Sequence, residues 1–344
     1  MTDKNIEKQL PGILRFFVKL FQIILYIPIQ IIFIPFAIIG LIVGIYKEMV
    51  KSKKMGVSFS AGQALQYRVY MHYFNTRPDP LSVAFTKKFP CESHLGLFSM
   101  MGALIVSQRL FGFTTRLGKL VEPGEETIDS TASIRVLTFD RIMEKYVDEM
   151  EQIVLPGVGF DLIALHFTGG KKVKVFELDQ VKTLDVKIET LKKAGIKHDW
   201  ITYIPVDYRN ESWVDKLIEA GFDKTKKTLF IWQSVSLFLE ADIIRKTLRE
   251  MADLCADGSI IAQDFYSKAF SLGANSLAVK SQKNMIEKMG ESWKFGIDMS
   301  KEKDPKAAVE SFLQECGLKI TEFIQFGEKL DIEPFYCIVE AEKL

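Results

Sequence analysis

The strongest constraint on this chain is an apolar run near its N-terminus. No residue from Leu20 to Tyr46 carries a charge, and Gln22 and Gln30 are its only clearly polar side chains. A helix rises about 1.5 Å per residue, so roughly 20 apolar residues cross the hydrocarbon core of a bilayer. The run exceeds the apolar region of about 7–15 residues in a secretory signal, and no polar stripe repeats along it. It therefore predicts a membrane segment.

Two prolines and the basic flanks bear on how this run sits in the membrane. Pro28 and Pro35 lie seven residues apart and can kink a helix. Basic residues precede the run (Arg15 and Lys19) and follow it more densely (Lys47, Lys51, Lys53 and Lys54). Residues 1–54 are thus predicted to form an anchor, with the following chain in the cytoplasm. We expect a single pass; a re-entrant or interfacial (monotopic) anchor is the alternative.

Charge balance and cysteine usage exclude several classes of protein. The 344 residues include 45 Lys and Arg and 44 Asp and Glu, a net charge of +1. This balance gives no electrostatic reason to expect a nucleic-acid partner. The four cysteines are scattered, without a CxxC pair and without metal-like spacing to the four histidines. That pattern predicts reduced thiols and no metal site.

From residue 152 onward, short β-type runs alternate with helical ones, which indicates a parallel sheet with helices on both faces. Two further runs near the end have no helix between them and predict an antiparallel hairpin at the sheet edge. The fold class expected is α/β, a doubly wound, Rossmann-like, mostly parallel sheet of seven strands. The expected strands are 152–155, 173–178, 200–206, 228–232, 259–262, 319–326 and 335–342, and the expected helices are 180–194, 211–220 and 240–256.

Residues 55–150 are expected to be largely helical and to cover the α/β domain at 151–344, in one globular unit (55–344). Helices are predicted at 61–74 and 133–151, and the turn NTRPDP at 75–80 ends the first of them. The lid over a binding site would come from about 55–130 and 265–300.

A glycine-rich loop follows the first predicted strand, where 156–161 reads PGVGFD. A ligand that crosses the carboxyl ends of the strands needs backbone close beneath it, which Gly157 and Gly159 permit. Glu177 and Asp179 come 20 and 22 positions after Gly157, where an acid suits a ribose diol. A third glycine, expected where a pyrophosphate binds, is replaced by Leu162. A nicotinamide dinucleotide is therefore disfavoured as the ligand.

Two more strand ends carry residues that suit a nucleoside. Asp207, after the third strand, can accept from an adenine amine while Tyr208 packs on the ring. Gln233 follows the fourth strand at the switch point, where ligands of such sheets bind.

With these residues in place, the chain resembles the leucine carboxyl methyltransferase-like family of class I methyltransferases, in its bacterial branch for small-molecule or polyketide O-methylation. The resemblance covers about residues 59–344, and class I methyltransferases share the expected seven-stranded layout. The stretches that carry it are NTRPDP (75–80), SIR (133–135), LPGVGFD (155–161), FELD (176–179), PVDY (205–208) and GESWKFG (290–296).

The resemblance implies S-adenosyl-L-methionine as the cosubstrate, and this molecule has no phosphate. It implies that Arg135 meets the methionine carboxylate, that Asp179 rather than Glu177 holds the ribose, and that Asp207 and Tyr208 hold the adenine. The sequence departs from the family pattern at Pro156, which stands in the glycine loop. In the block after the fourth strand, Gln233 replaces the family's glutamate and Phe238 its tyrosine.

The function predicted is S-adenosylmethionine-dependent methylation of a carboxylate or hydroxyl on a lipophilic small molecule at the membrane. Transfer from a sulfonium needs mainly alignment of the two reactants, and no convincing base is found, so the catalytic residues stay unassigned. The alternatives are a membrane-tethered scaffold with a decayed site, motivated by Gln233 and Pro156, and a nicotinamide oxidoreductase. The sequence leaves the oligomeric state open.

Overall fold

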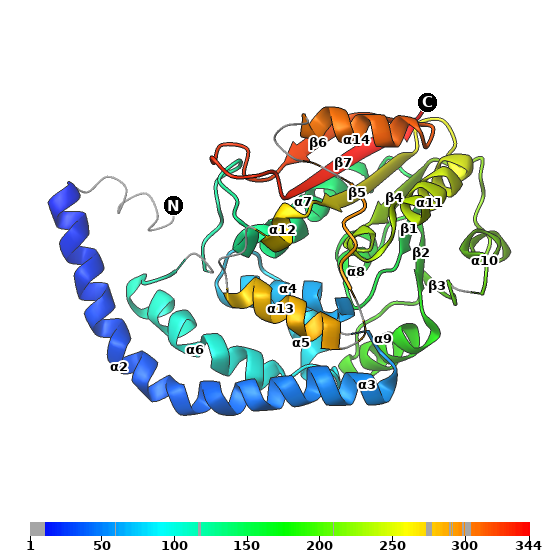
Figure 1. The fold of residues 1–344 in the computed structure, drawn as a ribbon. Helices are drawn as coiled ribbons and strands as arrows, with labels where there is room; N and C mark the ends of the chain where they lie inside the picture. Colours follow the sequence, from blue (N-terminus) through cyan, green and yellow to red (C-terminus); the bar gives the residue numbers. More distant parts are fainter. Residues whose placement is uncertain are drawn as a thin grey trace.

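A seven-stranded mixed sheet forms the centre of the computed structural model (Figure 1), which describes residues 11–58, 60–115, 118–208, 210–272, 277–288, 290, 292–297, 299 and 304–344. The strand order is β3-β2-β1-β4-β5-β7-β6, with β7 antiparallel to both of its neighbours and the other pairs parallel. The strands are β1 (Gln152–Pro156), β2 (Lys174–Asp179), β3 (Ile201–Pro205), β4 (Thr228–Trp232), β5 (Ile260–Tyr266), β6 (Leu318–Gln325) and β7 (Tyr336–Lys343).

Helices cover both faces of this sheet because each buries one apolar stripe against it. One core cluster takes most of its helical residues from α7 (Thr131–Tyr146), α8 (Ile163–Thr168) and α9 (Val181–Ala194). The other takes them from α10 (Trp213–Glu219), α11 (Ala241–Leu254) and α14 (Pro305–Gln314). The expected doubly wound α/β sheet with an edge hairpin is confirmed.

All seven predicted strands form, and two boundaries differ from the prediction in an informative way. The fifth strand was expected to end at Ala262 but continues to Tyr266. The strand therefore includes the polar residue Asp264. This side chain is buried, but it accepts hydrogen bonds from Ser234 and Tyr336, so the strand can continue through this position. The helix expected to reach residue 151 ends at Tyr146.

The region before the sheet is helical, as expected, and holds helices that the sequence patterns did not resolve. The helix expected at 61–74 is α4 (Gln63–Tyr73), and α5 (Pro80–Lys88) follows the proline turn. Asp79 caps α5 by accepting from the Ser82 amide at 2.9 Å. The apolar α6 (His94–Phe111) comes next, and α12 (Ala269–Leu272) and α13 (Leu277–Lys288) come after β5. Glu291 of the GESWKFG stretch and residues 1–10 of the predicted anchor lie outside the described residues.

The apolar run forms one continuous helix, α2 (Gly12–Ile45), followed by a π-helical turn (Tyr46–Lys51) and α3 (Ser52–Met55). It is the one candidate membrane span among the described residues, judged by length and composition alone. Figure 1 shows α2 as a curved helix on the outside of the molecule, beside α6. Pro28 and Pro35 both lie on its exposed side and leave the helix unbroken.

Candidate functional site

A cavity of about 1490 Å³ lies at the carboxyl ends of the parallel strands. The loops after β1, β2, β3 and β4 line one side of it, and parts of both predicted lid segments line the other. Ligand pockets commonly measure about 300–1,000 Å³, so this cavity has room for two reactants. Seven of the eight predicted site residues line it: Arg135, Gly157, Gly159, Asp179, Asp207, Tyr208 and Gln233.

The glycine loop needs both of its glycines. Gly157 has φ +67° and Gly159 has φ +55°, a region that side chains with a Cβ rarely adopt. A Cβ on Gly157 would lie 2.7 Å from a methyl of Val235, and one on Gly159 would lie 2.8 Å from the carbonyl oxygen of Ala61. The loop backbone is therefore pressed between the sheet and the segment before α4.

The two acids of β2 have different surroundings. Asp179, at the strand end, lines the cavity and accepts from the amides of Gly159 and Gln180, each at 2.7 Å. Burial raises the pKa of Asp179, and the two amides oppose that shift. Glu177 is 0% exposed and pairs with buried Lys187 at 2.7 Å, so the structure does not bring it to the cavity. Its side chain serves the packing of α9 against the sheet.

Asp207 and Tyr208, which are predicted to hold the adenine, line the cavity and are both exposed. Asp207 accepts a hydrogen bond from the side-chain amide of Asn210 at 2.7 Å, and its own amide donates to Glu211 at 2.8 Å. Tyr208 is 43% exposed, and its hydroxyl lies 3.3 Å from the amide of Gly157. The side chain of Tyr208 can thus cover a flat ring of a ligand, and the Asp207 carboxylate beside it can accept a hydrogen bond from an amine on that ring.

Arg135 reaches the cavity from α7 and is 5% exposed. Its guanidinium donates to the hydroxyls of Ser234 and Tyr266, the latter at 2.9 Å, while its Nε has no partner among the described residues. Asp264 lies behind them and accepts from the Ser234 amide at 2.8 Å and from the Tyr336 hydroxyl at 2.9 Å. Burial raises the pKa of Asp264, and the nearby Arg135 charge opposes that shift.

Gln233 connects the cavity to a buried polar network. Its amide nitrogen donates to Asp161 at 2.9 Å, while its Oε1 has no hydrogen-bond partner among the described residues. Asp161 also accepts from Arg68 Nε at 2.8 Å, and its backbone oxygen accepts from Lys187 at 2.7 Å. The neutral amide donates to a carboxylate here, which the family's glutamate could do only in its protonated form.

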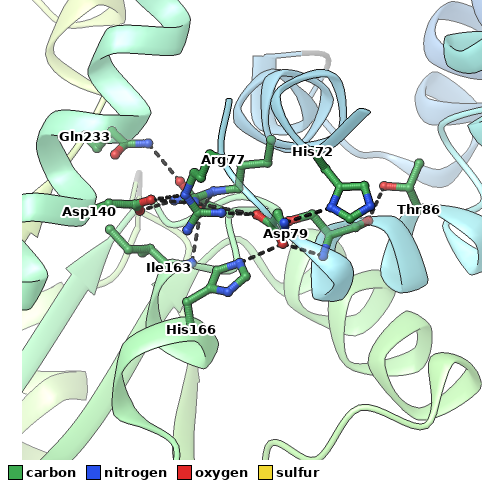
Figure 2. Close-up of polar contacts among 11 residues, drawn as sticks. His72, Arg77, Asp79, Thr86, Asp140, Ile163, His166 and Gln233 are labelled. Atoms are coloured by element: carbon green, nitrogen blue, oxygen red, sulfur yellow. Dashed lines mark hydrogen bonds and ion pairs between the residues drawn. The ribbon is translucent and has the colours of Figure 1, made fainter. Parts of the chain in front are cut away.

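Arg68 extends the network to three carboxylates, at 2.8 Å to Asp161, 3.0 Å to Asp140 and 3.8 Å to Asp79. Figure 2 shows the part of the network around Asp79 and Asp140. His166 Nε2 lies 3.0 Å from Asp79. Burial alone would raise the pKa of Asp79, but the His166 hydrogen bond and charge, together with Arg68, lower it well below its usual range. Arg77 also pairs with Asp79 and Asp140. These charges hold α4, α5, α7 and the glycine loop together.

Pro156 fits its position. It is the last residue of β1, and pairing with β4 ends two residues earlier, at Val154. The Gly157 amide donates toward β2, to Leu178 at 2.8 Å, so the preceding amide position faces the unpaired side. The missing N–H of proline therefore costs no ladder hydrogen bond.

Sequence reasoning missed Ser234, Asp264 and Tyr266. Ser234 directly follows the predicted site residue Gln233 and has φ +57°, a conformation more usual for glycine. Asp264 and Tyr266 lie beyond the predicted end of their strand. The hub Arg68 gave no local signal, because its three acids come from distant parts of the chain.

The sheet order, the loop after β1 and the acids at the ends of β2 and β3 define the class I methyltransferase fold. The sequence profile of the leucine carboxyl methyltransferase family matches residues 108–252. The match covers less than half of the chain, and over this stretch the predicted resemblance to the family is confirmed.

Proteins with similar sequences bear the name "Putative S-adenosyl-L-methionine-dependent methyltransferase". One from Frankia alni is 31% identical over 129 residues, which cover 37% of this chain and 44% of that protein. One from Mycobacterium ulcerans is 26% identical over 173 residues, which cover 49% and 54%. The chain thus spans about half the length of these curated relatives. Their names agree with the predicted cosubstrate.

Solved structures give more distant likenesses. Mitomycin 7-O-methyltransferase has a TM-score of 0.42 at 12% identity, over 63% of this chain and 56% of that one. Human N-acetylserotonin methyltransferase in complex with SAM has a TM-score of 0.40 at 12% identity, over 63% and 54%. At these scores neither likeness supports an inference about the acceptor.

Proposed function

We propose that this protein is an S-adenosylmethionine-dependent methyltransferase that methylates a carboxylate or hydroxyl oxygen of a lipophilic small molecule at a membrane. The observation that carries the proposal is the convergence of Arg135, the glycine loop, Asp179 and Asp207 on one cavity. These residues come from four separate stretches of the chain and suit the parts of one cosubstrate.

The residues present fit that cosubstrate. A Cβ at Gly157 or Gly159 would clash with its neighbours, so backbone rather than side chains lies beneath the ligand. Arg135 would bind the methionine carboxylate through charge-assisted hydrogen bonds, and the free Oε1 of Gln233 would accept from the ammonium group. Asp179 would accept from the ribose hydroxyls, while Asp207 and Tyr208 would hold the adenine.

The chemistry asks this chain mainly for alignment. S-adenosylmethionine supplies a methyl group on a positively charged sulfur. The cavity walls would hold the acceptor oxygen in line with that methyl group. A carboxylate acceptor needs no base, whereas a hydroxyl acceptor does. None of the described cavity-lining residues is a histidine, and a base for a hydroxyl acceptor would come from a lining carboxylate such as Glu122, Glu125 or Asp129.

The lipophilic acceptor is supported by the part of the cavity away from the glycine loop. The two predicted lid segments and the segment after β4 contribute apolar side chains to its walls, beside acidic ones such as Glu122 and Glu125. The apolar residues are Leu120, Val121, Ile128, Leu237, Phe238, Phe270 and Trp293. The cavity-lining segment that begins at Lys119 follows Phe113, whose ring packs on Tyr26 of α2 at 4.6 Å between centroids. The predicted anchor thus contacts a residue that precedes this cavity-lining segment in the chain, which suits an acceptor that partitions into the membrane.

Isothermal titration of the detergent-solubilised full chain with S-adenosylmethionine tests the cosubstrate. We expect binding that unlabelled NAD does not compete away, and no binding would overturn the proposal. Incubation with methyl-labelled cosubstrate and a lipid extract tests turnover. Binding without transfer to any extract would favour the alternative, a tethered scaffold with a decayed site, which Gln233 and Pro156 motivate.

A further inference from the structure

The predicted membrane run is docked along its length on the globular domain. One stripe of α2 is wholly or partly buried, at every third or fourth residue (Gln22, Leu25, Tyr26, Ile29, Phe33, Ala37, Gly40 and Gly44). This stripe lies along α6, which runs antiparallel to α2 (Figure 1). The residues that would cross a bilayer are thus the same residues that contact the domain.

The contact between the two helices is close at glycines. A Cβ on Gly40 would lie 2.9 Å from the carbonyl oxygen of Gly96, and a Cβ on Gly96 would lie 2.9 Å from that of Gly40. A Cβ on Gly102 would overlap the ring of Phe33 at 2.1 Å. At the other end, the Gln22 side chain donates to the carbonyl oxygen of Phe111 at 3.0 Å. Small residues that let two backbones approach this closely are typical of helix pairs packed within membranes.

The remaining surface of α2 is apolar and uncovered. Of the 31 exposed large hydrophobic side chains in the described part of the chain, 21 lie between Ile13 and Val50. On α6, Leu95 is 74% exposed and Leu110 is 70% exposed, at the two ends of the stripe that contacts α2. A lipid phase is the partner that such a long and strongly apolar surface fits.

Charge at the two ends of α2 is the second observation. Exposed basic side chains stand at both ends, Lys19 on one side and Lys53 and Lys54 on the other. A span would carry one of these ends to the far side of the membrane, against the positive-inside tendency. An in-plane helix keeps both ends beside the anionic headgroups of one leaflet.

We propose that α2 is a monotopic anchor, which lies in one leaflet on the domain's α6 and does not span the bilayer. This inference rests on the membrane association proposed above and is independent of methyl transfer. The bilayer contacts the outer face of α2 together with Leu95 and Leu110 of α6. Both basic ends then remain on the side of the globular domain.

Thiol labelling tests this topology. Lys19→Cys and Lys54→Cys variants of the full chain are bound to preformed sealed vesicles of phosphatidylcholine and phosphatidylglycerol and treated with a membrane-impermeant maleimide. The four native cysteines are buried. We expect both variants to label to the same extent before detergent is added. Labelling at position 54 alone would show a span and overturn the proposal.

Cross-linking tests whether the helix pair persists in the membrane. The Cβ of a residue at position 40 would lie 3.1 Å from Ser99 Cβ and 2.9 Å from the carbonyl oxygen of Gly96. A cysteine there must therefore move the two helices slightly apart, which also brings the two Cβ atoms toward the separation of about 3.5–4.5 Å in disulfides. A Gly40→Cys, Ser99→Cys double variant should form a disulfide in vesicles. The control, Ile39→Cys with Ser99→Cys, places the first thiol on the exposed face and should not. Loss of the Gly40 cross-link in vesicles, when it forms in detergent, would contradict docking.

Vesicle binding separates this proposal from the enzymatic one. Leu95→Lys with Leu110→Lys should weaken vesicle partitioning about tenfold or more, since each leucine leaves an apolar phase. The matched control is Ile218→Lys, on α10, which should have no effect. Partitioning unchanged by the α6 variants would overturn the role of α6. A wild-type chain that binds no vesicles would overturn the anchor, while its binding of S-adenosylmethionine tests the methyltransferase proposal separately.

Discussion

Two buried arginines of this protein lie in opposite kinds of surroundings. Arg68 is 0% exposed, and three carboxylates lie within 3.8 Å of its guanidinium. Arg135 is 5% exposed, donates to the hydroxyls of Ser234 and Tyr266, and keeps its Nε unpartnered at the cavity. Arg68 is paired directly with its carboxylates, whereas Arg135 donates to two hydroxyls and has a single buried carboxylate, Asp264, behind them.

The difference indicates which arginine is structural and which is available to a ligand. A buried charge is stable only when it is paired and its donors are satisfied. The Arg68 network meets that condition by itself. Arg135 would meet it when an anionic group occupies the cavity, which is the reason for assigning it the methionine carboxylate.

The largest effect should come from removing the cation of the Arg68 network, in which Arg68 is paired with Asp79, Asp140 and Asp161. Replacing Arg68 by Met leaves buried carboxylates without their cation, and we expect a loss of about 3–5 kcal/mol in the free energy of unfolding. Urea denaturation in detergent measures it. The exposed Lys193, paired with Glu189 on α9, gives the control: Lys193→Met should leave the denaturation midpoint unchanged. Equal midpoints for Arg68→Met and wild type would refute a structural role for the network.

The corresponding change at the cavity should affect binding more than stability. Arg135→Met removes a charge-assisted interaction of about 1.5–3 kcal/mol, so S-adenosylmethionine should bind roughly 10–100-fold more weakly. Titration calorimetry measures the affinity, and denaturation should show a smaller loss than in Arg68→Met. Arg135→Lys, which keeps the charge without the planar fork, should fall between. An unchanged affinity in Arg135→Met would remove this residue from the site.

Glu177 and Asp179 of β2 offer the same comparison between a structural side chain and one that is available to a ligand. Asp179→Asn should weaken cosubstrate binding about tenfold, because a ribose diol donates better to a carboxylate than to an amide. Glu177→Gln should instead lower stability, because buried Lys187 loses its ion pair. If Glu177→Gln lost affinity and Asp179→Asn kept it, the assignment of the ribose acid would have to be reversed.

Low pH should weaken the ion pairs of the Arg68 network. The folded-state pKa of Asp79 is lowered, so its contribution is present above its unfolded pKa of about 3.9 and is lost as pH falls below that value. Stability measured by urea denaturation should therefore drop below about pH 4. Asp79→Asn should be less stable at neutral pH and should show a shallower drop. A pH profile of the same slope in both proteins would exclude Asp79 as a source of the acid sensitivity.

The smallest changes are expected at Gln233, which lines the cavity and also donates to Asp161 of the Arg68 network. Gln233→Leu removes one hydrogen bond to Asp161 and one free acceptor at the cavity. We expect a loss of about 1 kcal/mol in stability and a several-fold loss in affinity. Calorimetry and denaturation of the same preparation measure both. An affinity that stays the same while stability falls would place Gln233 wholly in the structural network.

Sequence patterns were sufficient for features that depend on neighbours along the chain. The alternation after residue 152 predicted all seven strands, and the loop PGVGFD with FELD and PVDY predicted which residues would gather at one edge of the sheet. Parallel strands bring their carboxyl ends together, so local strand assignment already implies this convergence. The charge-free length of the N-terminal run likewise predicted an apolar helix.

Only the tertiary structure decided which polar groups pair across distant segments. The sequence could not separate Glu177 from Asp179 by geometry, nor show that Asp264 and Tyr266 support Arg135, because burial and partners from other strands settle these points. The same holds for α2: its composition predicted an affinity for lipid, but its orientation depends on α6, whose Gly96 and Gly102 allow the close approach. Apolarity is a property of a segment, whereas the direction in which it faces is set by what packs against it.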